Sequence, residues 1–314
     1  MKIAFIDDWT ASAAEHVKAH QLAASHDIQI FTDHLKGPAL IERLMPFDII
    51  CIMRERTLFD AGLIGSLPNL RALVTNGMNN AAIDLAACRA HNIIVSGSVS
   101  PGHATAELAM TLIGAMARNI VPNHMGMLNG GWQSGAGRDL RGATLGVLGL
   151  GRLGAALAQF GKAYGMNIVA WSQNLTQEAA AEKDVTYLPK EDFFAQADFI
   201  SIHLKLSPRV TGLVGAQEFS LMKPTASIVN TSRAPIIDED ALINALINGE
   251  IAGAAIDVYG TEPLPAEHPL RKVPNLLLSP HIGYVTNETM AVFYRDSLAC
   301  LDAIIKGEPI RLLT

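Results

Sequence analysis

The sequence predicts an α/β protein whose strands form parallel sheets in two domains. Three observations lead to this prediction. Short apolar runs rich in β-branched residues alternate with longer segments of helical periodicity. The alternation occurs in two series, and a glycine-rich stretch, Gly126–Gly137, which we expect to be a surface loop, precedes the second. The length of 314 residues suits two domains of roughly 100–200 residues each.

The first series runs from Lys2 to Val95 and predicts one compact domain of β-strands alternating with helices. Strands are expected at Lys2–Ile6, Ile28–Phe31, Asp48–Met53, Leu70–Thr75 and Ile93–Val95, with helices at Ala11–His20 and Ile83–His91.

The second series begins near Thr144 and has the same character. Strands are expected at Thr144–Leu148, Asn167–Trp171, Phe199–His203, Ser227–Asn230, Gly253–Asp257 and Leu276–Leu278, with helices at Leu153–Tyr164 and Asp238–Asn248. Two further helices are expected to join the domains: Ala104–Ala117 and the last helix, where apolar residues repeat from Met290 to Ile305. A chain that passes twice between its domains leaves a cleft of the kind that commonly holds ligands.

Composition and charge argue against several classes of protein. The formal net charge is −6 and no long basic run occurs, so nucleic-acid binding is not expected. The chain begins as a strand that meets Asp7 and Asp8, so we expect no signal peptide, and no apolar stretch approaches a membrane span. Cys51, Cys88 and Cys300 lie far apart, which suits a reducing cytoplasm and indicates neither a disulfide framework nor a metal site.

A glycine-rich turn follows the strand Thr144–Leu148 and precedes an apolar helix. In this turn Gly149 permits a tight bend, Gly151 lets the backbone approach a pyrophosphate, and Gly154 allows close packing of helix on strand. The pyrophosphate would lie at the helix N-terminus. The alternative is an ordinary turn between strand and helix, but the order strand, turn, helix and second strand favours a dinucleotide site.

The next strand ends in Ala170–Asn174, where the ribose of the cofactor should lie. An NAD enzyme typically carries Asp or Glu about 20 residues beyond the turn to bind the ribose 2′-hydroxyl. Here no carboxylate would repel a 2′-phosphate, and no neighbouring Arg or Lys in the sequence would bind one strongly. Ser172 and Asn174 could hydrogen-bond either form, so the sequence leaves NAD and NADP both open.

Three later strands are each followed by charged or polar residues. Arg233 follows the strand at Ser227–Asn230, Asp257 and Glu262 follow the next strand, and His281 follows the third. Because parallel sheets bind ligands at the carboxyl edge of their strands, these side chains could converge there.

These residue types suit the interconversion of a 2-oxo acid and a 2-hydroxy acid. Arg233 could bind the carboxylate and the carbonyl oxygen through its guanidinium fork. His281 could protonate the developing alkoxide and recover the proton in the reverse direction, while Glu262 could hold the second imidazole nitrogen and favour the charged form.

Each of these residues also has a purely structural interpretation. Arg233 could pair with Asp257 in a salt bridge, Glu262 could be a solvated loop carboxylate, and His281 could be a capped turn residue. The occurrence of all three behind a dinucleotide turn favours the catalytic interpretation.

The chain resembles the D-isomer-specific 2-hydroxyacid dehydrogenase family over nearly its whole length. The most specific segments are Gly149–Gly154, Asn230–Arg233, Asp257–Pro263 and Ser279–Gly283. The resemblance implies two doubly wound parallel-sheet domains, with a Rossmann nucleotide-binding domain (residues 100–284) inserted in a flavodoxin-like substrate domain (residues 1–99 and 285–314). It also implies an NAD(P)-dependent enzyme that is a homodimer, with Arg233, Glu262 and His281 as the catalytic residues.

The resemblance further implies which residues contact the ligands. Beside the glycine turn and Ser172, the cofactor site would include Thr105, Arg152, Leu153, Thr231, Ser232, Arg233, Asp257, His281 and Gly283. The substrate would be bound by Asn76, Gly77 and Met78, in the loop Asn76–Asn79 whose backbone amides hold the substrate carboxylate, together with Arg233 and His281. The chain departs from the family pattern at Ala234, Gly260 and Ser172.

Two questions stay open at the level of sequence. Arg54 ends a strand on the same edge as Asn76, where it could bind a second anionic group of the substrate or take part in a salt-bridge cluster. The fold also supports an alternative function, a non-enzymatic protein that senses NAD(H), because a fold does not decide an activity.

Overall fold

The computed structural model describes residues 1–314. The chain forms two compact units, one made of Met1–Pro101 with Val285–Thr314 and the other of Gly102–Tyr284. Each unit contains one parallel sheet, of five and seven strands respectively, which confirms the predicted fold class. None of the helices combines the length and the apolar character that crossing a membrane requires.

The first unit has the strand order β2-β1-β3-β4-β5, which is the flavodoxin-like arrangement. The central strands β3 and β4 are apolar runs with every residue buried, as expected for a parallel sheet covered on both faces. The strands are β1 (Lys2–Ile6), β2 (Asp27–Ile30), β3 (Ile49–Ile52), β4 (Ala72–Thr75) and β5 (Ile94–Gly97).

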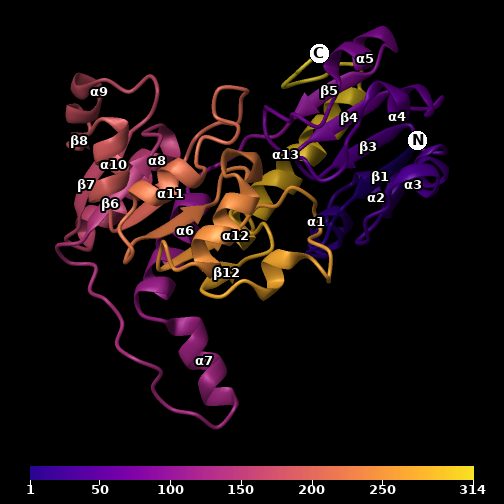
Figure 1. The fold of residues 1–314 in the computed structure, drawn as a ribbon. Coiled ribbons are helices and arrows are strands. Elements are labelled where there is room, and N and C mark those ends of the chain that lie inside the picture. Colours follow the sequence, from indigo (N-terminus) through magenta and orange to yellow (C-terminus); the bar gives the residue numbers. More distant parts are fainter. The chain divides into compact units, whose positions relative to one another are not determined.

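The helices of this unit include one from the far end of the chain. They are α1 (Ala13–Lys18), α2 (Leu22–Ser25), α3 (Gly37–Leu44), α4 (Ala61–Gly65), α5 (Leu85–Ala90) and α13 (Asn287–Ile305). Helix α13 packs against α1, β4 and β5 (Figure 1). The segment after it completes the unit, because Leu313 donates its amide to the carbonyl of Val95 and Leu312 forms an antiparallel bridge with Ser96.

The second unit has the strand order β12-β11-β10-β9-β6-β7-β8. The order reverses between β6 and β9, and ligands of open α/β sheets bind beyond the carboxyl ends of the strands at such a point. The strands are β6 (Thr144–Leu148), β7 (Asn167–Trp171), β8 (Thr186–Tyr187), β9 (Phe199–Ile202), β10 (Ser227–Asn230), β11 (Gly253–Ile256) and β12 (Leu276–Leu278).

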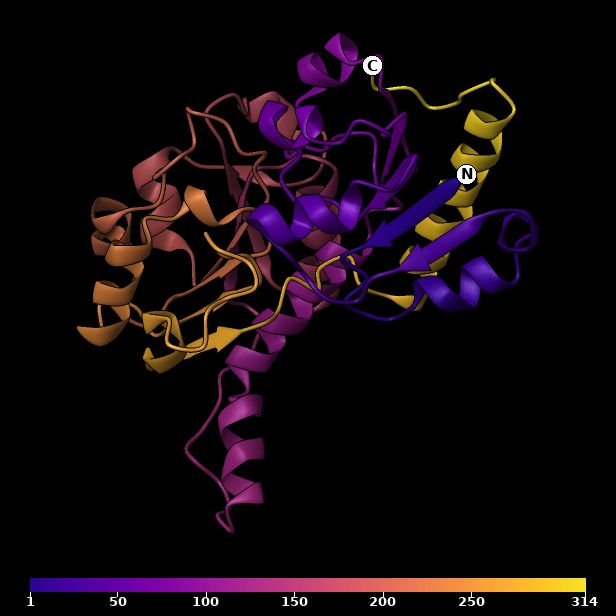
Figure 2. The same ribbon diagram turned by 90° about the vertical axis from the view of Figure 1, so that its right-hand side faces the viewer.

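Helices cover both faces of this sheet, and each face has its own core. One core gathers buried side chains of α10, α11 and α12, including Phe193, Phe219 and Leu242, while the other gathers those of α6 and α8, including Ile113 and Leu157. Figure 2 shows the same unit after a quarter turn. The helices are α6 (Ala104–Ala117), α7 (Ile120–Leu128), α8 (Arg152–Ala163), α9 (Gln177–Ala181), α10 (Lys190–Gln196), α11 (Ala216–Leu221) and α12 (Glu239–Ile247), with 3-10 turns η1 (Ala234–Ile236) and η2 (Pro269–Lys272).

The structure corrects one expectation about the glycine-rich stretch Gly126–Gly137. Its first residues are not a loop but the end of α7, which continues to Leu128. None of the residues of α7 is buried, and its last turn contains Gly126, the residue at which the glycine-rich stretch begins. In both views α7 projects away from the sheet of its own unit (Figures 1 and 2).

Two glycines inside helices should respond to alanine in opposite directions. A Cβ at Gly154 would overlap the carbonyl oxygen of Gly149, whereas a Cβ at Gly114 would meet nothing within 4 Å. Gly154→Ala should therefore lower the free energy of unfolding by about 1–3 kcal/mol through overpacking. Gly114→Ala should raise it by about 0.5–1 kcal/mol, because alanine loses less backbone entropy on folding. Urea denaturation of the two variants measures both; changes of the same sign would contradict this account.

Candidate active site

The glycine turn lies between the ends of two other strands. Gly149 follows β6 with a φ of +101°, a conformation that favours glycine. Its amide donates to the carbonyl of Trp171 at the end of β7, at 2.9 Å. On the other side, a Cβ at Gly149 would lie 2.9 Å from the carbonyl oxygen of His203, just beyond β9. The turn thus meets the segments after β7 and after β9.

The next two glycines of the turn fit a bound dinucleotide. Gly151 precedes the first residue of α8, is exposed, and has open space where a Cβ would be. A phosphate can approach the backbone there and interact with the N-terminus of the helix. Gly154 is buried, and its lack of a side chain lets α8 pack directly on the turn.

Two buried side-chain atoms on the same edge of the sheet have no partner in the chain. They are Oγ1 of Thr231, which follows β10, and Nδ1 of His203, which follows β9. Buried polar atoms are almost always hydrogen-bonded in folded proteins. An edge with orphaned polar atoms and an open glycine turn fits a polar ligand such as a nicotinamide dinucleotide.

Several other residues expected at the cofactor lie around this edge. The guanidinium of Arg152 lies against Gly102, where a Cβ would overlap it. Thr105 lies beside Gly283, because a Cβ built there would be 3.3 Å from Cγ2 of Thr105. Leu153 is half-buried on α8, and Ser172 is half-buried directly after β7.

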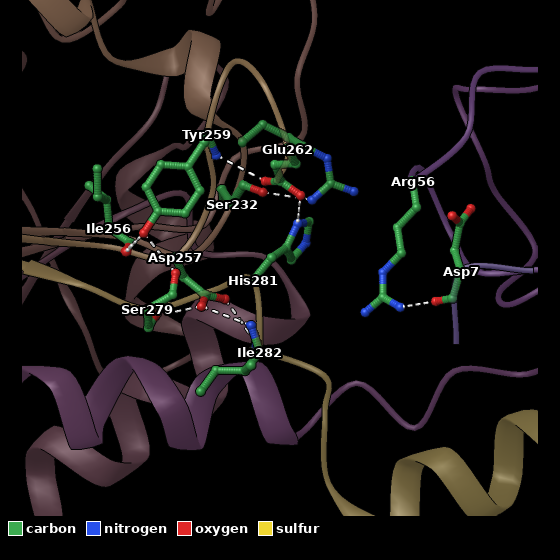
Figure 3. Close-up of polar contacts among 12 residues, drawn as sticks. Asp7, Arg56, Ser232, Ile256, Asp257, Tyr259, Glu262, Ser279, His281 and Ile282 are labelled. Carbon is green, nitrogen blue, oxygen red and sulfur yellow. Dashed lines mark hydrogen bonds and ion pairs between the residues drawn. The ribbon is translucent and has the colours of Figure 1, made fainter. Parts of the chain in front are cut away.

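A carboxylate holds the histidine that follows β12. Oε2 of Glu262 lies 2.6 Å from Nδ1 of His281, and Oε1 of the same carboxylate accepts the amide of Tyr259 at 2.9 Å (Figure 3). Burial alone would raise the pKa of Glu262, but the hydrogen bond and charge of His281 outweigh burial and lower it. With Nδ1 engaged by Glu262, the other ring nitrogen of His281, Nε2, is the one that could exchange a proton with a substrate.

A second carboxylate fixes the backbone on both sides of this histidine. Asp257 is buried and accepts three hydrogen bonds: from Oγ of Ser279 at 2.5 Å, from the amide of Ile282 at 2.9 Å and from that of Gly283 at 2.8 Å (Figure 3). Burial raises the pKa of Asp257 in spite of these donors. His281 itself has a φ of +54°, so its backbone conformation depends on this bracing.

Arg233 follows β10 in a turn that is braced in the same way. The side chain of Asn230 accepts the amide of Ser232 at 2.9 Å and donates to the carbonyl of Arg233 at 3.0 Å. Oγ of Ser232 donates to the carbonyl of Ile202 at 2.8 Å. The positive charge of Arg233 also lowers the pKa of Glu262, so the two side chains lie in the same part of the site.

The structure brings the three predicted catalytic residues to adjacent strands. Arg233 follows β10, Glu262 lies in the loop after β11, and His281 follows β12, and these three strands are neighbours in the sheet. The expected convergence at one edge is therefore present in the fold of this unit.

The residues expected to bind the substrate carboxylate lie in the first unit, after β4. Asn76 is buried and its side chain contacts Met53 and Ser297. Gly77 donates its amide to Oγ of Ser98 at 3.0 Å. Its amide is thus already engaged, a contact that the sequence did not indicate. The guanidinium of Arg54 lies beside Gly77, with Nη1 3.6 Å from where a Cβ would be.

A cluster that sequence analysis did not single out lies at the end of β1. Asp7 is buried, and its carboxylate contacts Nδ1 of His34 at 2.7 Å and Oγ1 of Thr57 at 2.6 Å. Its carbonyl accepts from Nη1 of Arg56 (Figure 3). The guanidinium of Arg56 lies 4.1 Å from the ring centroid of Trp9. The sequence feature that could have indicated this cluster is Asp7 itself, an aspartate directly after a buried strand.

A family model described as "D-isomer specific 2-hydroxyacid dehydrogenase, NAD binding domain" matches residues 110–283, which lie within the second unit. The chain belongs to the D-isomer-specific 2-hydroxyacid dehydrogenase family. It is therefore an oxidoreductase that uses NAD(P) and acts on CH–OH groups.

Relatives of this dehydrogenase match along most of its length. A glyoxylate reductase of Thermococcus litoralis is 34% identical, over 90% of this chain and 88% of the relative. A 4-methyl-2-oxopentanoate reductase A of Aspergillus oryzae is 36% identical, over 85% and 84%. The crystal structure of a phosphoglycerate oxidoreductase from Vibrio cholerae o395 superimposes with a TM-score of 0.92 at 35% identity, covering 98% of this chain and 99% of that one.

Acid should destabilise the dehydrogenase partly through His203. Burial lowers the pKa of this histidine to about 4, against about 6.5 in an unfolded chain. Between these values the unfolded chain binds a proton that the folded chain does not, so the free energy of unfolding falls as the pH falls. The loss from this group should approach about 3 kcal/mol at pH 4. Urea denaturation from pH 7 to pH 4 measures this loss. In His203→Gln the free energy of unfolding should fall less steeply with pH over the same range; an equal fall in both proteins would contradict the role given to His203.

Proposed function

We propose that this dehydrogenase interconverts a small 2-oxo acid and the corresponding D-2-hydroxy acid, with His281 as the acid and base. The hydrogen bond of 2.6 Å between Glu262 and His281, on a braced loop at the carboxyl edge of the nucleotide-binding sheet, is the observation that supports this most directly. In reduction His281 would donate a proton from Nε2 to the carbonyl oxygen of the substrate, and in oxidation it would take that proton back.

Glu262 would orient the imidazole through its hydrogen bond to Nδ1. Its lowered pKa keeps this carboxylate ionised at neutral pH. The carboxylate 2.6 Å from Nδ1 would hold that ring nitrogen, so that the other nitrogen, Nε2, faces the substrate. Bound nicotinamide supplies or accepts the hydride at the substrate carbon.

Arg233 would bind the substrate carboxylate and polarise its carbonyl. A guanidinium offers donors in a planar fork that matches two neighbouring oxygens of a 2-oxo acid. Developing negative charge on the carbonyl oxygen would be stabilised by the same cation. The turn braced by Asn230 and Ser232 would keep the side chain in place without a rearrangement.

Residues 1–99 with 285–314, which lie within the first unit, would be the substrate domain, and residues 100–284 the nucleotide-binding domain. Because Gly77 already donates to Ser98, the substrate carboxylate would be bound by the amides of Met78 and Asn79, which have no partner within the chain. Asn76 would shape this loop from beneath. Arg54, beside Gly77, would bind a second anionic group where the substrate carries one.

The remaining predicted residues would hold NAD or NADP. Gly149, Gly151 and Gly154 would admit the pyrophosphate beside Arg152 and Leu153, and Ser172 would meet the ribose. Asp257 would act by positioning the loop, since its oxygens accept donors from the chain itself. The nicotinamide half would be lined by Thr105, Thr231, Ser232, Arg233, His281 and Gly283.

Variants of the three proposed catalytic residues should lose turnover while retaining cofactor binding. His281→Ala and Arg233→Ala should each lower kcat at least about 100-fold, the usual contribution of a positioned acid or base. Glu262→Gln should lose less and shift the pH profile of kcat, because it keeps a hydrogen-bond partner without the charge. NADH and NADPH oxidation with glyoxylate, hydroxypyruvate, pyruvate, 4-methyl-2-oxopentanoate and oxaloacetate measures these effects.

The control is His268→Ala, which removes a histidine from the start of η2 and should leave turnover unchanged. In the same panel, Arg54→Met should raise KM for oxaloacetate, which has a second carboxylate, more than for pyruvate. Turnover of His281→Ala close to the wild type at neutral pH would rule out the acid–base assignment.

We also infer that the enzyme is a homodimer that pairs through the segment from α7 to Trp132. This segment exposes large apolar side chains, with Leu128 68% and Trp132 73% exposed, and further members at Ile120, Val121, Met125 and Met127. Monomeric proteins rarely expose apolar patches of this kind, and a second copy would bring an identical patch to cover it.

Charges on this segment should dissociate the dimer. Met125→Glu combined with Leu128→Glu should halve the mass measured by light scattering, from twice 33.6 kDa to one chain, because the buried carboxylates would lack partners. Ile247→Glu changes an equally exposed apolar residue on α12 and should leave the mass unchanged. A wild-type enzyme of single-chain mass, or an undiminished mass for the double variant, would contradict the assignment.

A further inference from the structure

The guanidinium of an arginine from the loop after β9 contacts the segment after β7, where sequence analysis expected no nearby Arg or Lys. Nη2 of Arg209 donates to Oδ1 of Asn174 at 3.2 Å, although the two residues are 35 positions apart. Nε2 of Gln173 donates to the carbonyl of Arg209 at 2.9 Å. The segment after β7 and the loop after β9 are therefore joined by two hydrogen bonds.

These contacts lie at the adenosine end of the dinucleotide site. Strand β6 lies between β7 and β9, so the two joined segments meet across the turn that β6 enters. The same turn contacts Trp171 on one side and His203 on the other. In this fold the residues after the second strand of the motif meet the ribose of the adenosine half. Arg209 and Ser172 thus both lie at the place where the ribose 2′ group is recognised.

The charges around this place favour an anion. Neither the segment 170–176 nor the loop 203–212 contains an aspartate or glutamate, and no carboxylate contacts Arg209. Arg209 is exposed, and the hydrogen-bond partner of its guanidinium is the neutral amide of Asn174. On the neighbouring side, Nζ of Lys183 donates to the carbonyl of Leu150 in the glycine turn at 2.6 Å. The site therefore has cations and neutral hydrogen-bonding groups but lacks the acidic residue that an NAD-specific site uses.

We propose that Arg209, together with Ser172, binds the 2′-phosphate of NADP and gives the enzyme a preference for NADPH over NADH. The guanidinium would form charge-assisted hydrogen bonds to the phosphate oxygens, and the hydroxyl of Ser172 would add a neutral one. Asn174 accepts a hydrogen bond from the guanidinium and orients it, and Gln173 holds the backbone of Arg209 beside the segment after β7. NADH, which has only a hydroxyl at this position, gains none of the charge-assisted bonds.

The inference rests on the family's use of NAD(P) and is independent of the roles proposed for His281, Glu262 and Arg233. Failure of those catalytic roles would leave the affinities for the two cofactors unchanged. A wrong assignment of Arg209 would leave turnover with either cofactor dependent on His281.

The test is calorimetric titration with two matched pairs of ligands, so that binding is measured without turnover. The pairs are NADPH with NADH, and adenosine 2′,5′-bisphosphate with AMP; each pair differs only by the 2′-phosphate. The wild type should bind the phosphorylated member at least about 10-fold more tightly. Arg209→Ala should lower that affinity about 10- to 100-fold and change the affinity for NADH and AMP less than about 3-fold.

Two further variants make the test specific. Lys205→Ala removes an exposed cation from the same loop and should leave both ratios close to those of the wild type. Ser172→Asp introduces the missing carboxylate and should reverse the preference towards NADH by repelling the phosphate and binding the hydroxyl. Thermal unfolding of each variant confirms that it is folded.

Three outcomes would overturn the assignment. One is a wild-type enzyme that binds NADH as tightly as NADPH. Another is an Arg209→Ala variant that weakens all four ligands equally, which indicates a structural role of the loop. The third is a Lys205→Ala variant that lowers both ratios as much as Arg209→Ala, which indicates attraction by general positive charge.

Discussion

The buried carboxylate of Asp257 is the group on which the geometry of the site depends. It lies at the end of β11 and accepts a side chain and two backbone amides from the loop after β12, which brackets His281. Burial makes its charge costly, and those three donors compensate for the lost hydration. The left-handed backbone of His281 is thereby fixed, and its ring meets Glu262 at 2.6 Å. Without Asp257, the loop that contains His281 would lose three of the hydrogen bonds that hold its backbone.

Much of this arrangement could be predicted because local pattern and topology agree. Strands β6, β7, β10 and β12 have the predicted bounds, and each is followed directly by a glycine or a polar residue that ends the apolar run. The convergence of Arg233, Glu262 and His281 followed from a single rule: the carboxyl ends of parallel strands share one edge of the sheet. That rule needs only the order of residues within each segment and no contact between distant segments.

The features that escaped prediction depend on contacts between segments far apart in the chain. Arg209 meets Asn174 because β9 and β7 flank β6, an order that no local pattern encodes. Gly77 is engaged by Ser98, which comes from the end of the neighbouring strand β5. Helix α7 was assigned to a loop from Gly126 onwards because glycine is frequent from that residue to Gly137, although the helix itself continues to Leu128.

The division of the first unit into two stretches of chain has a consequence for biosynthesis. Helix α13 and the segment after it cover β4 and β5, yet they are translated only after the whole second unit. A nascent chain would therefore present a sheet with part of its apolar surface uncovered while residues 102–284 emerge and fold as a continuous unit. Covering this surface brings together residues about two hundred positions apart, as in the hydrogen bond from the amide of Val95 to the hydroxyl of Thr314. Because the ribosome makes the chain from its N-terminus, the first unit can complete its fold only after Val285–Thr314 has been synthesised.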